Sequence, residues 1–487
     1  MVTLRRSHIL LGSLVALAAV LRFATLDVQS FWSDEASTAD LLHRSLPAVF
    51  ARVADGESTP PLYYVLAWTW AHVFGTGEAG LRALSALFGT LLVPVAWWLG
   101  QRLAPGHARR AGALAALLVA TNPLLVWFSQ EARAYALLVL LVALSVAVLL
   151  WVLEAPSRGR LLAWGAVAAL ALATHYFAVF FVAAEAVWLL AALGVGAAPA
   201  ALALPLLTAG ALAPLALAQR NADRAGFIRA EPFGTRLAQI PKQFIAGYDA
   251  PAEVVVTALA AAGVTAALVS LGLRAPTAGG ADRRALARLA AAAGLSLLLP
   301  VILAALGNDY VITRNVVATL AAVLVLAGVG LALVPRRGGV AVGGALAALW
   351  VTVVVCVAAN PALQRDDWRS AADALGPAAP VTRAVVVTPG SGRVPALLYL
   401  PGTRVAGRPG QTFPLQEISV LAVAPQQGPK PRSTPPVPEV SPIPGFAPAG
   451  GGHGKTWRVV RFRAAQPIAV DAASLSTGGA VVLLQGP

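Results

Sequence analysis

The stretch YALLVLLVALSVAVLLWVL, from Tyr135 to Leu153, decides the class of fold because it contains no charged side chain. A helix rises about 1.5 Å per residue, so a run of this length crosses the ~30 Å hydrocarbon core of a bilayer. Similar runs rich in Ala, Leu and Val recur along most of the 487-residue chain, in which 58% of residues are hydrophobic and 12% are charged. Soluble domains average about 25% charged residues. The sequence therefore predicts an all-α polytopic membrane protein.

We expect about eleven transmembrane helices. The apolar runs that predict them cover residues 9–27, 83–100, 112–128, 135–153, 161–174, 177–194, 198–217, 252–272, 286–306, 315–334 and 339–359. The first run follows Arg5 and Arg6 and has no convincing cleavage site, so we predict that it is a retained span and not a removed signal peptide.

One further segment, PPLYYVLAWTWAHVFG from Pro60 to Gly75, is ambiguous because it is short and begins with two prolines. If this segment does not span, most loop arginines fall on one side of the membrane, as the positive-inside rule requires. Those arginines are Arg5, Arg6, Arg102, Arg109, Arg110, Arg158, Arg160, Arg274, Arg283, Arg284, Arg336 and Arg337. We therefore predict a cytoplasmic N-terminus and a helix over 60–75 that lies at the outer interface, where its aromatic residues fit.

This orientation predicts two domains. Residues 1–359 are expected to form the transmembrane domain, with long outer loops at 28–82 and 218–251. Residues 360–487 are much less apolar and are expected to form a small extracytoplasmic α/β domain. Runs typical of strands occupy residues 384–388, 418–423 and 457–463, whereas the Pro- and Gly-rich stretch 428–452 predicts a loop or linker.

The formal charge of +14 does not indicate nucleic-acid binding. The basic residues are mostly single arginines between apolar runs, without an interleaved aromatic patch, and positive-inside orientation explains much of the charge. We expect membrane lipids as partners and no nucleic acid.

The unusual polar residues nearly all fall on the predicted outer side. The stretch FWSDEAST, residues 31–38, places two adjacent carboxylates just after the first span. The other outer candidates are Tyr63, Gln130, Glu131, Arg133, Tyr135, His175, Arg314, Asp366 and Asp367. Ionisable groups at membrane depth are costly and are functional candidates by default.

Each of these residues also has a structural explanation. Asp34 and Glu35 would favour the N-terminus of a helix that starts after Ser33, and Asp366 and Asp367 would do the same for a later helix. The turn with Glu131 and Arg133 could be merely solvated, His175 could anchor the interface, and Arg314 could snorkel. The case for a site rests on the joint pattern of carboxylates and cations on one face.

A lipid-linked phosphosugar would use both kinds of group. A carboxylate can take the proton of an acceptor hydroxyl, and Arg and His can hold a phosphate leaving group. The lipid tail would stay in the bilayer while the phosphate sits at the interface. A soluble nucleotide sugar would be absent outside the cell, and the sequence has no Walker or dinucleotide fingerprint.

The ordered motifs resemble the GT-C fold integral-membrane glycosyltransferases, specifically the protein-mannosyltransferase-like group (glycosyltransferase family 39), which is related to lipid A aminoarabinose transferases. The matching motifs are Asp34-Glu35, the TPPL stretch from Thr59, the RALS stretch from Arg82, FSQEARAYAL at 128–137, THYF at 174–177 and DWRSAADAL at 367–375. The resemblance covers roughly residues 8–375 and is strongest over 28–195. The GT-C fold also carries interfacial helices in its first outer loop, in agreement with the layout predicted from charge.

The resemblance implies that a sugar, with mannose the leading expectation, moves with inversion from a polyprenyl-phosphate carrier to an outer acceptor hydroxyl on a glycan, lipid or protein. Asp34 is then the expected base, with Glu35 as its partner. The expected substrate-binding residues are Arg133, Arg314, Glu131, Tyr135, His175 and Tyr63. The chain departs from the family in having Asn315 where Tyr often follows the arginine, and Thr59 where some relatives have Lys.

Two other functions fit the bulk composition. A transporter or lipid flippase would also have many spans. Transporters, however, tend to place their sites near the membrane midplane between internal repeats, and no such repeat is visible in this sequence. A noncatalytic scaffold would leave the ordered motifs unexplained. Paired carboxylates can bind a divalent cation, but no His/Cys ligand spacing accompanies Asp34 and Glu35, and we predict no cofactor.

Overall fold

A computed structural model describes residues 2–223, 226–275, 282–377, 381–406, 410–425, 433–476 and 479–486. The chain divides into two compact units, each of which combines two segments of the chain. The helical unit is Met1–Leu26 with Arg44–Cys356, and the sheet unit is Asp27–His43 with Val357–Pro487. The motif with Asp34 and Glu35 therefore belongs to the same unit as the C-terminal region.

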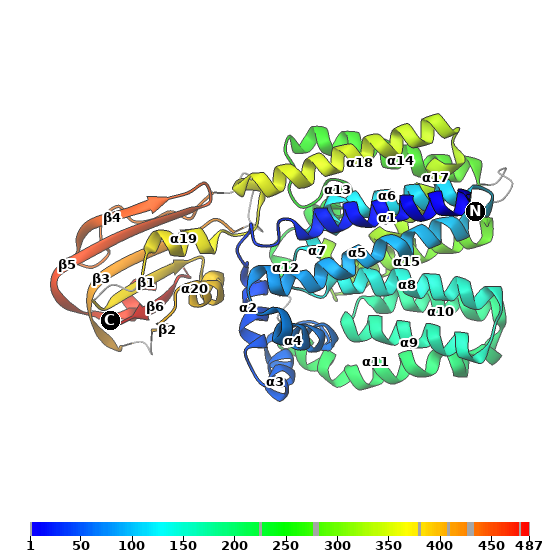
Figure 1. Ribbon diagram of the computed structural model, residues 1–487. Helices are drawn as coiled ribbons and strands as arrows, with labels where there is room; N and C mark the ends of the chain where they lie inside the picture. The colour runs from blue at the N-terminus through cyan, green and yellow to red at the C-terminus, as the bar shows by residue number, and fades with distance from the viewer. Residues whose placement is uncertain are drawn as a thin grey trace. The chain divides into compact units, whose positions relative to one another are not determined.

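The helical unit contains long helices that run side by side (Figure 1). They are α1 (Val2–Phe23), α5 (Glu78–Leu103), α6 (Ala108–Thr121), α8 (Tyr135–Glu154), α9 (Arg158–Thr174), α10 (Ala178–Leu193), α11 (Ala198–Asn221), α14 (Glu253–Arg274), α15 (Arg283–Ala305), α17 (Ala318–Leu333) and α18 (Arg336–Ala359). Shorter elements are α3 (Leu46–Gly56), α4 (Leu62–Phe74), α7 (Pro123–Ser129), α12 (Gly226–Ala230), α13 (Phe233–Ala246), α16 (Thr313–Val316) and the 3₁₀ turns at Pro105–His107 and Val195–Ala197.

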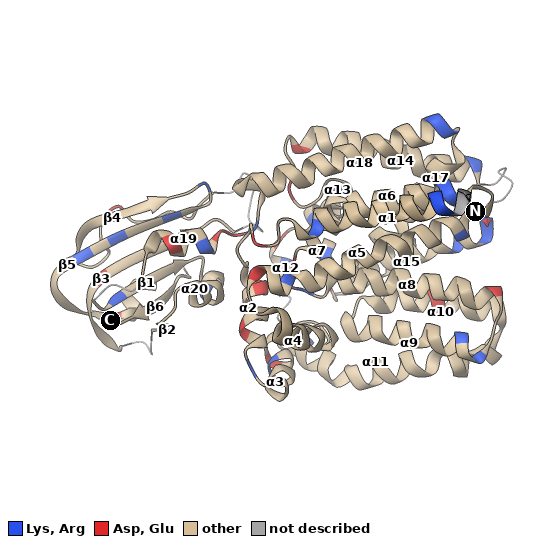
Figure 2. Ribbon diagram, viewed as in Figure 1, with Lys and Arg blue, Asp and Glu red and all other residues tan. Residues whose placement is uncertain are grey.

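Every predicted apolar run is helical over most of its length, which confirms a polytopic membrane protein. Within the described residues, seven helices are long and apolar enough to cross a membrane, or eight if the bent pair of α6 and α7 counts as one span. α10 and α17 are shorter apolar helices, of 16 residues each. The number eleven and the orientation stay predictions. Figure 2 shows basic residues gathered at the end of this unit that carries the N-terminus, the pattern from which a cytoplasmic N-terminus was predicted.

The predicted span 112–128 is not one straight helix, because it bends by 59° between α6 and α7. The Asn122 side chain caps α7 by accepting hydrogen bonds from two backbone amides, and Pro123 occupies the first helical position. Arg22, buried in α1, donates to the carbonyls of Val119 and Ala120 at 3.1 and 2.8 Å. Its guanidinium thus satisfies carbonyls that the break leaves without helical partners.

The segment predicted at the outer interface forms α4. Its 13 residues rise about 20 Å, less than the hydrocarbon thickness. Both α3 and α4 lie at the end of the helical unit opposite the N-terminus (Figure 1). The second predicted outer loop, 218–251, contains α12 and α13, while residues 224–225 lie outside the described part of the chain.

One carboxylate lies inside the helix bundle. Glu185 of α10 has no solvent exposure and accepts hydrogen bonds from Trp164 of α9 and Ser145 of α8, each at 2.7 Å. A buried polar group is costly unless it is hydrogen-bonded. The three side chains therefore tie three helices together.

The sheet unit contains a six-stranded sheet in the order β2-β6-β1-β3-β5-β4. The strands are β1 (Arg383–Thr388), β2 (Thr403–Val405), β3 (Thr412–Val423), β4 (Ala447–His453), β5 (Trp457–Asp471) and β6 (Val481–Gln485). β1 and β3 are parallel and the other neighbours are antiparallel. The helices of this unit are α2 (Ser33–Leu42), α19 (Trp368–Leu375), α20 (Arg393–Tyr399) and α21 (Ala472–Leu475), with 3₁₀ turns at Pro361–Leu363 and Gly390–Gly392.

The three predicted strands are confirmed as β1, β3 and β5. The predicted loop at 428–452 is partly wrong, because β4 forms at its end; residues 428–432 lie outside the described residues. β4 pairs only with β5 and is an edge strand, where Gly and Pro are tolerated.

Side chains of the central strand β1 alternate between two apolar clusters. Val385 and Val387 of β1 pack with α19 and α20 in one apolar cluster. Ala384 and Val386 face the opposite cluster, which includes Phe446. The alternation follows from the period of two in a strand.

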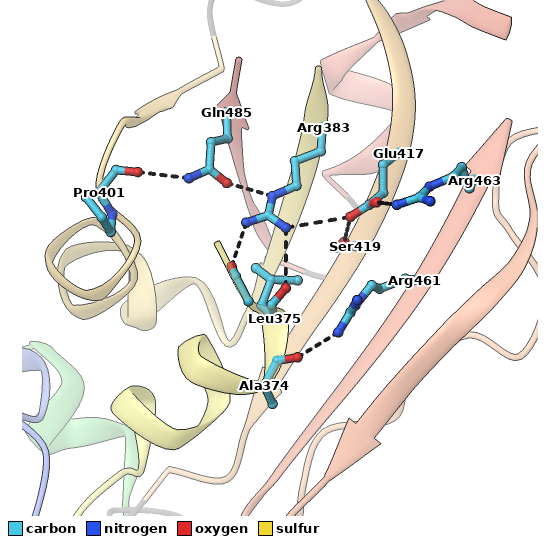
Figure 3. A network of polar contacts seen from close by, with 10 residues as sticks. Ala374, Leu375, Arg383, Pro401, Glu417, Ser419, Arg461, Arg463 and Gln485 are labelled. Carbon is cyan, nitrogen blue, oxygen red and sulfur yellow. Dashed lines mark hydrogen bonds and ion pairs between the residues drawn. The ribbon is translucent and has the colours of Figure 1, made fainter. Parts of the chain in front are cut away.

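A polar network lies at the C-terminal end of α19 (Figure 3). Arg383 is 2% exposed and donates to the carbonyl oxygens of Leu375 and Gly376 and, at 2.6 Å, to Gln485. Its guanidinium also lies 3.7 Å from Glu417. Cationic side chains at the last carbonyls stabilise a helix C-terminus, so this network fixes α19 on the sheet.

Candidate active site

Asp34 and Glu35 lie in the first turn of α2, which begins at Ser33. Carboxylates at this end interact favourably with the helix dipole. This position agrees with the structural explanation of the motif, which placed both carboxylates at a helix N-terminus. Their surroundings differ, because Glu35 is fully buried whereas Asp34 is partly exposed. The two neighbouring carboxylates are therefore not equivalent.

Glu35 faces a buried arginine. Arg365 Nε lies 3.8 Å from Glu35 Oε2, and both side chains are almost completely buried. Gln29 Oε1 accepts hydrogen bonds from Arg365 Nη1 and the Arg365 backbone amide, at 3.2 and 2.9 Å. A buried charge needs an opposite charge and hydrogen bonds. This pair joins the FWSDEAST motif at 31–38 to the residue that stands two positions before the DWRSAADAL motif at 367–375.

Backbone contacts fix the segment that leads into α2. The Ser30 hydroxyl donates to the Asp366 carbonyl at 2.6 Å and accepts from the Trp368 amide at 3.0 Å. The Phe31 amide donates to the Tyr399 hydroxyl at 2.7 Å. These contacts position the first turn of α2, and with it Asp34, on α19 and α20.

In the helical unit, Arg133 pairs with a buried glutamate. Arg133 Nη2 donates to Glu57 Oε2 at 2.9 Å, and the two residues are 7% and 8% exposed. The Tyr64 hydroxyl donates to the same oxygen at 2.6 Å. Burial, the largest cause, raises the pKa of Tyr64 well above its ordinary value of 10, so the phenol keeps its proton and acts as the donor.

Tyr63 supports the turn that carries Arg133. Its hydroxyl lies 3.0 Å from the Ser85 hydroxyl, which donates to the Arg133 carbonyl at 3.3 Å. Tyr63 is fully buried. The TPPL and RALS motifs thus converge on the FSQEARAYAL turn, and Tyr63 acts in this structure as a buried support.

His175 is 3% exposed, and its Nδ1 accepts from the Phe177 amide at 3.2 Å. Burial lowers the pKa of His175 from 6.5 to about 3, and the positive charges of Arg314 and Arg133 add to this effect. The imidazole is therefore neutral at physiological pH. The role of His175 as a substrate-binding residue stays a prediction, and we assign it no positive charge for a phosphate.

Arg314 lies in α16 and is partly exposed, with its guanidinium 5.2 Å from the centre of the Phe227 ring. The segment before it is held by Asp309, which accepts from Arg236 at 2.9 and 2.5 Å. The hydrogen bond from Arg236 lowers the pKa of Asp309. This bidentate pair positions the short helix that presents Arg314.

The remaining two predicted residues flank Arg133. Glu131 is 2% exposed, and its carbonyl accepts from the Arg133 amide at 2.8 Å. Tyr135 is 3% exposed, with its ring centre 6.0 Å from that of His175. The helical unit thus brings together the predicted residues Arg133, Tyr135, His175, Glu131 and Tyr63, and the charge of Arg314 acts on the same histidine.

Sequence reasoning missed Glu57 and Arg236. Glu57 lies two residues before Thr59 of a quoted motif, and that proximity was the available signal. Arg236 was only one of several arginines in an outer loop. Among the described residues, no group of three or more His, Cys, Asp and Glu side chains could hold a metal ion.

Residues 58–218 match the family model described as dolichyl-phosphate-mannose-protein mannosyltransferase. This match contains Arg133 and His175 and begins one residue after Glu57. This match covers less than half of the chain and shows that this part is similar to the family. No curated protein matches its sequence.

Solved structures align with this chain, and the one with a TM-score above 0.5 shares its overall fold. The apo structure of ArnT from Cupriavidus metallidurans aligns with a TM-score of 0.57 at 15% identity, over 92% of this chain and 97% of that one. ArnT of the same organism bound to undecaprenyl phosphate aligns with a TM-score of 0.45 at 18% identity, over 67% of this chain and 61% of that one. The arabinosyltransferase EmbB from Mycobacterium smegmatis gives 0.42 at 14% identity, over 74% of this chain and 31% of that one. This chain thus spans less than two thirds of the undecaprenyl-phosphate-bound ArnT and of EmbB.

Proposed function

We propose that the chain is a membrane glycosyltransferase that moves a sugar from a polyprenyl-phosphate carrier to an acceptor hydroxyl. The acceptor oxygen forms a bond to the anomeric carbon while the bond between that carbon and the phosphate oxygen breaks, so the configuration inverts. The hydroxyl proton passes to a carboxylate, and polyprenyl phosphate leaves. The family match at residues 58–218 supports the donor class, because the description of that family names a polyprenyl-type phosphate sugar.

Asp34 is the proposed base. The observation that carries this assignment is the different burial of the two neighbouring carboxylates, since Glu35 faces Arg365 in the interior while Asp34 is partly exposed. A base must reach the hydroxyl that it deprotonates, within about 3 Å or through one water. Glu35 then acts as the partner that holds the first turn of α2 in position.

Arg314 and Arg133 are the proposed groups for the donor phosphate. Arg314 is the more accessible of the two, and a guanidinium matches phosphate oxygens in geometry as well as charge. The Arg133 guanidinium is already held by Glu57, so we assign it a fixed positive charge near His175 and not a mobile ligand. Tyr135 and His175 would line the donor site as neutral aromatic side chains.

Mannose is the first sugar to test, because the matched family is described by mannose transfer. We further propose that the chain lies in the cytoplasmic membrane with its reaction on the outer face, where a lipid-linked donor serves in place of a nucleotide sugar. The acceptor would be a glycan, lipid or protein hydroxyl of the cell envelope.

The experiment is a donor panel with the purified, reconstituted full-length chain. Each polyprenyl-phosphate sugar carries a radiolabel in the sugar, and cell-envelope extract supplies acceptors. Label that moves from the lipid phase to an acceptor, with one sugar preferred, supports the enzyme and identifies the donor. Lipid movement across the bilayer without any transfer of label would favour the flippase instead.

A further inference from the structure

A cavity of about 280 Å³ lies in the helical unit, away from every residue assigned to sugar transfer. Its walls come from the ends of α5, α8 and α10 and from the start of α15. These four helix ends belong to loops predicted to face the cytoplasm, on the side opposite the proposed reaction. The Asp282 amide donates to the Leu103 carbonyl at 3.0 Å, which fixes the start of α15 against the end of α5.

The cavity combines cations with apolar walls. Arg102, Arg284 and Arg288 line it, and Asp282 is the only acidic residue among the lining residues that the structure describes. Asp282 is engaged as the cap of α15, where it accepts from the Ala285 amide at 3.0 Å. Arg102 is paired with Glu154, so the positive charge available to an anion comes from Arg284 and Arg288.

Trp188 supplies an aromatic wall of the cavity and is 5% exposed. Its indole Nε1 is covered by protein atoms, so the ring and not the N–H is available to a ligand. The Arg288 guanidinium lies 5.9 Å from the centre of the indole ring. A phosphate oxygen in the cavity would accept from this arginine.

We propose that this cavity binds the phosphate group of an anionic membrane phospholipid. Basic pockets between transmembrane helices on the cytoplasmic side are suited to such head groups. Leu150, Leu153 and Leu193 line the same cavity and would contact the start of the acyl chains. A free phosphate ion would make the polar contacts but would leave these leucines without a partner.

The test measures the thermal stability of the purified full-length chain in a neutral detergent. The additives are phosphatidylglycerol, phosphatidylcholine and inorganic phosphate, each at the same phosphate concentration. Phosphatidylglycerol should raise the melting temperature in a saturable manner, and the other two should not. An equal shift with phosphatidylcholine would overturn the proposal by indicating an apolar site, and an equal shift with inorganic phosphate would overturn it by indicating a free-anion site.

Two double variants with the same loss of charge distinguish binding in the cavity from attraction to the general positive charge of that surface. Arg284→Gln with Arg288→Gln removes two lining cations, whereas Arg336→Gln with Arg337→Gln removes two exposed ones outside the lining. The first should bind phosphatidylglycerol roughly 10-fold more weakly, and the second should bind it like the wild type. Unchanged affinity in the double variant Arg284→Gln with Arg288→Gln would overturn the proposal.

Discussion

Arg133 and Tyr64 donate hydrogen bonds to one oxygen of Glu57, at 2.9 and 2.6 Å, in a site where all three residues are at most 8% exposed. The arrangement holds the arginine charge in a fixed place between the TPPL motif and the start of α8. A positive charge that is fixed before the substrate arrives costs no reorganisation when a phosphate develops charge. In the proposed reaction, Glu57 therefore acts as a positioning residue for Arg133.

Glu57→Gln should lower the free energy of unfolding by about 3 kcal/mol, because it leaves the buried Arg133 without its counter-charge. The measurement is denaturant unfolding of the helical unit in detergent. Asp223→Asn is the matched control, because it removes the acid of the exposed pair with Arg229, and such pairs contribute about 0–1 kcal/mol. Equal effects of the two substitutions would contradict the buried role of Glu57.

Glu35→Gln and Arg365→Gln should each speed amide hydrogen exchange in α2 by roughly 100-fold, since each leaves a buried charge unpaired. Amide hydrogen exchange in α2 should be slower in the double variant than in either single variant, because no unpaired buried charge then remains. Strictly additive effects in this cycle would show that the two side chains do not interact.

The stability of the chain should fall as the pH is lowered from 7 to 5, and His175 should cause part of the fall. Its folded pKa of about 3 lies below the unfolded value of 6.5, so the unfolded chain binds the extra proton between these values. This stabilisation is complete above pH 6.5 and is lost as the pH falls towards 3, by at most about 1.4 kcal/mol per pH unit. His175→Gln should flatten the dependence of the melting temperature on pH; a slope identical to that of the wild type would contradict a neutral buried imidazole.

Arg383→Met should destabilise the sheet unit by about 2 kcal/mol, because the α19 carbonyls lose charged donors and Gln485 loses its partner. Figure 3 shows how these groups converge on one guanidinium. Arg393→Met, at an exposed position of α20, makes the same chemical change and should be nearly neutral. Hydrogen exchange in α19 provides the readout, and equal protection in both variants would contradict the capping role.

The helices were predictable because a long apolar run in a bilayer must hydrogen-bond its own backbone N–H and C=O groups, and a helix does this within one segment. The break after α6 was not, because the run at 112–128 is apolar on both sides of Asn122 and its bend depends on contacts from Arg22 and Asn122. β4 was missed because a stretch rich in Gly and Pro predicts a loop, whereas an edge strand tolerates both residues.

For the site, sequence identified both carboxylates of the Asp34-Glu35 pair but not their different surroundings. The difference arises from Arg365, which lies far along the chain and meets Glu35 only in the folded sheet unit. In the same way, Arg133 was predicted as a substrate-binding residue without a partner being named, and its partner Glu57 lies at the C-terminal end of α3. Local pattern indicates which residues are unusual, whereas pairing and burial depend on long-range packing.

The most direct test of the account compares Asp34→Asn with Asp40→Asn, the same change at an exposed position of the same helix. The measurement is the rate at which each reconstituted, folded protein releases free polyprenyl phosphate from its preferred donor in the presence of acceptor. We predict a loss of at least about 100-fold for Asp34→Asn and a wild-type rate for Asp40→Asn. A wild-type rate in Asp34→Asn would contradict the assignment of this carboxylate as the base for sugar transfer.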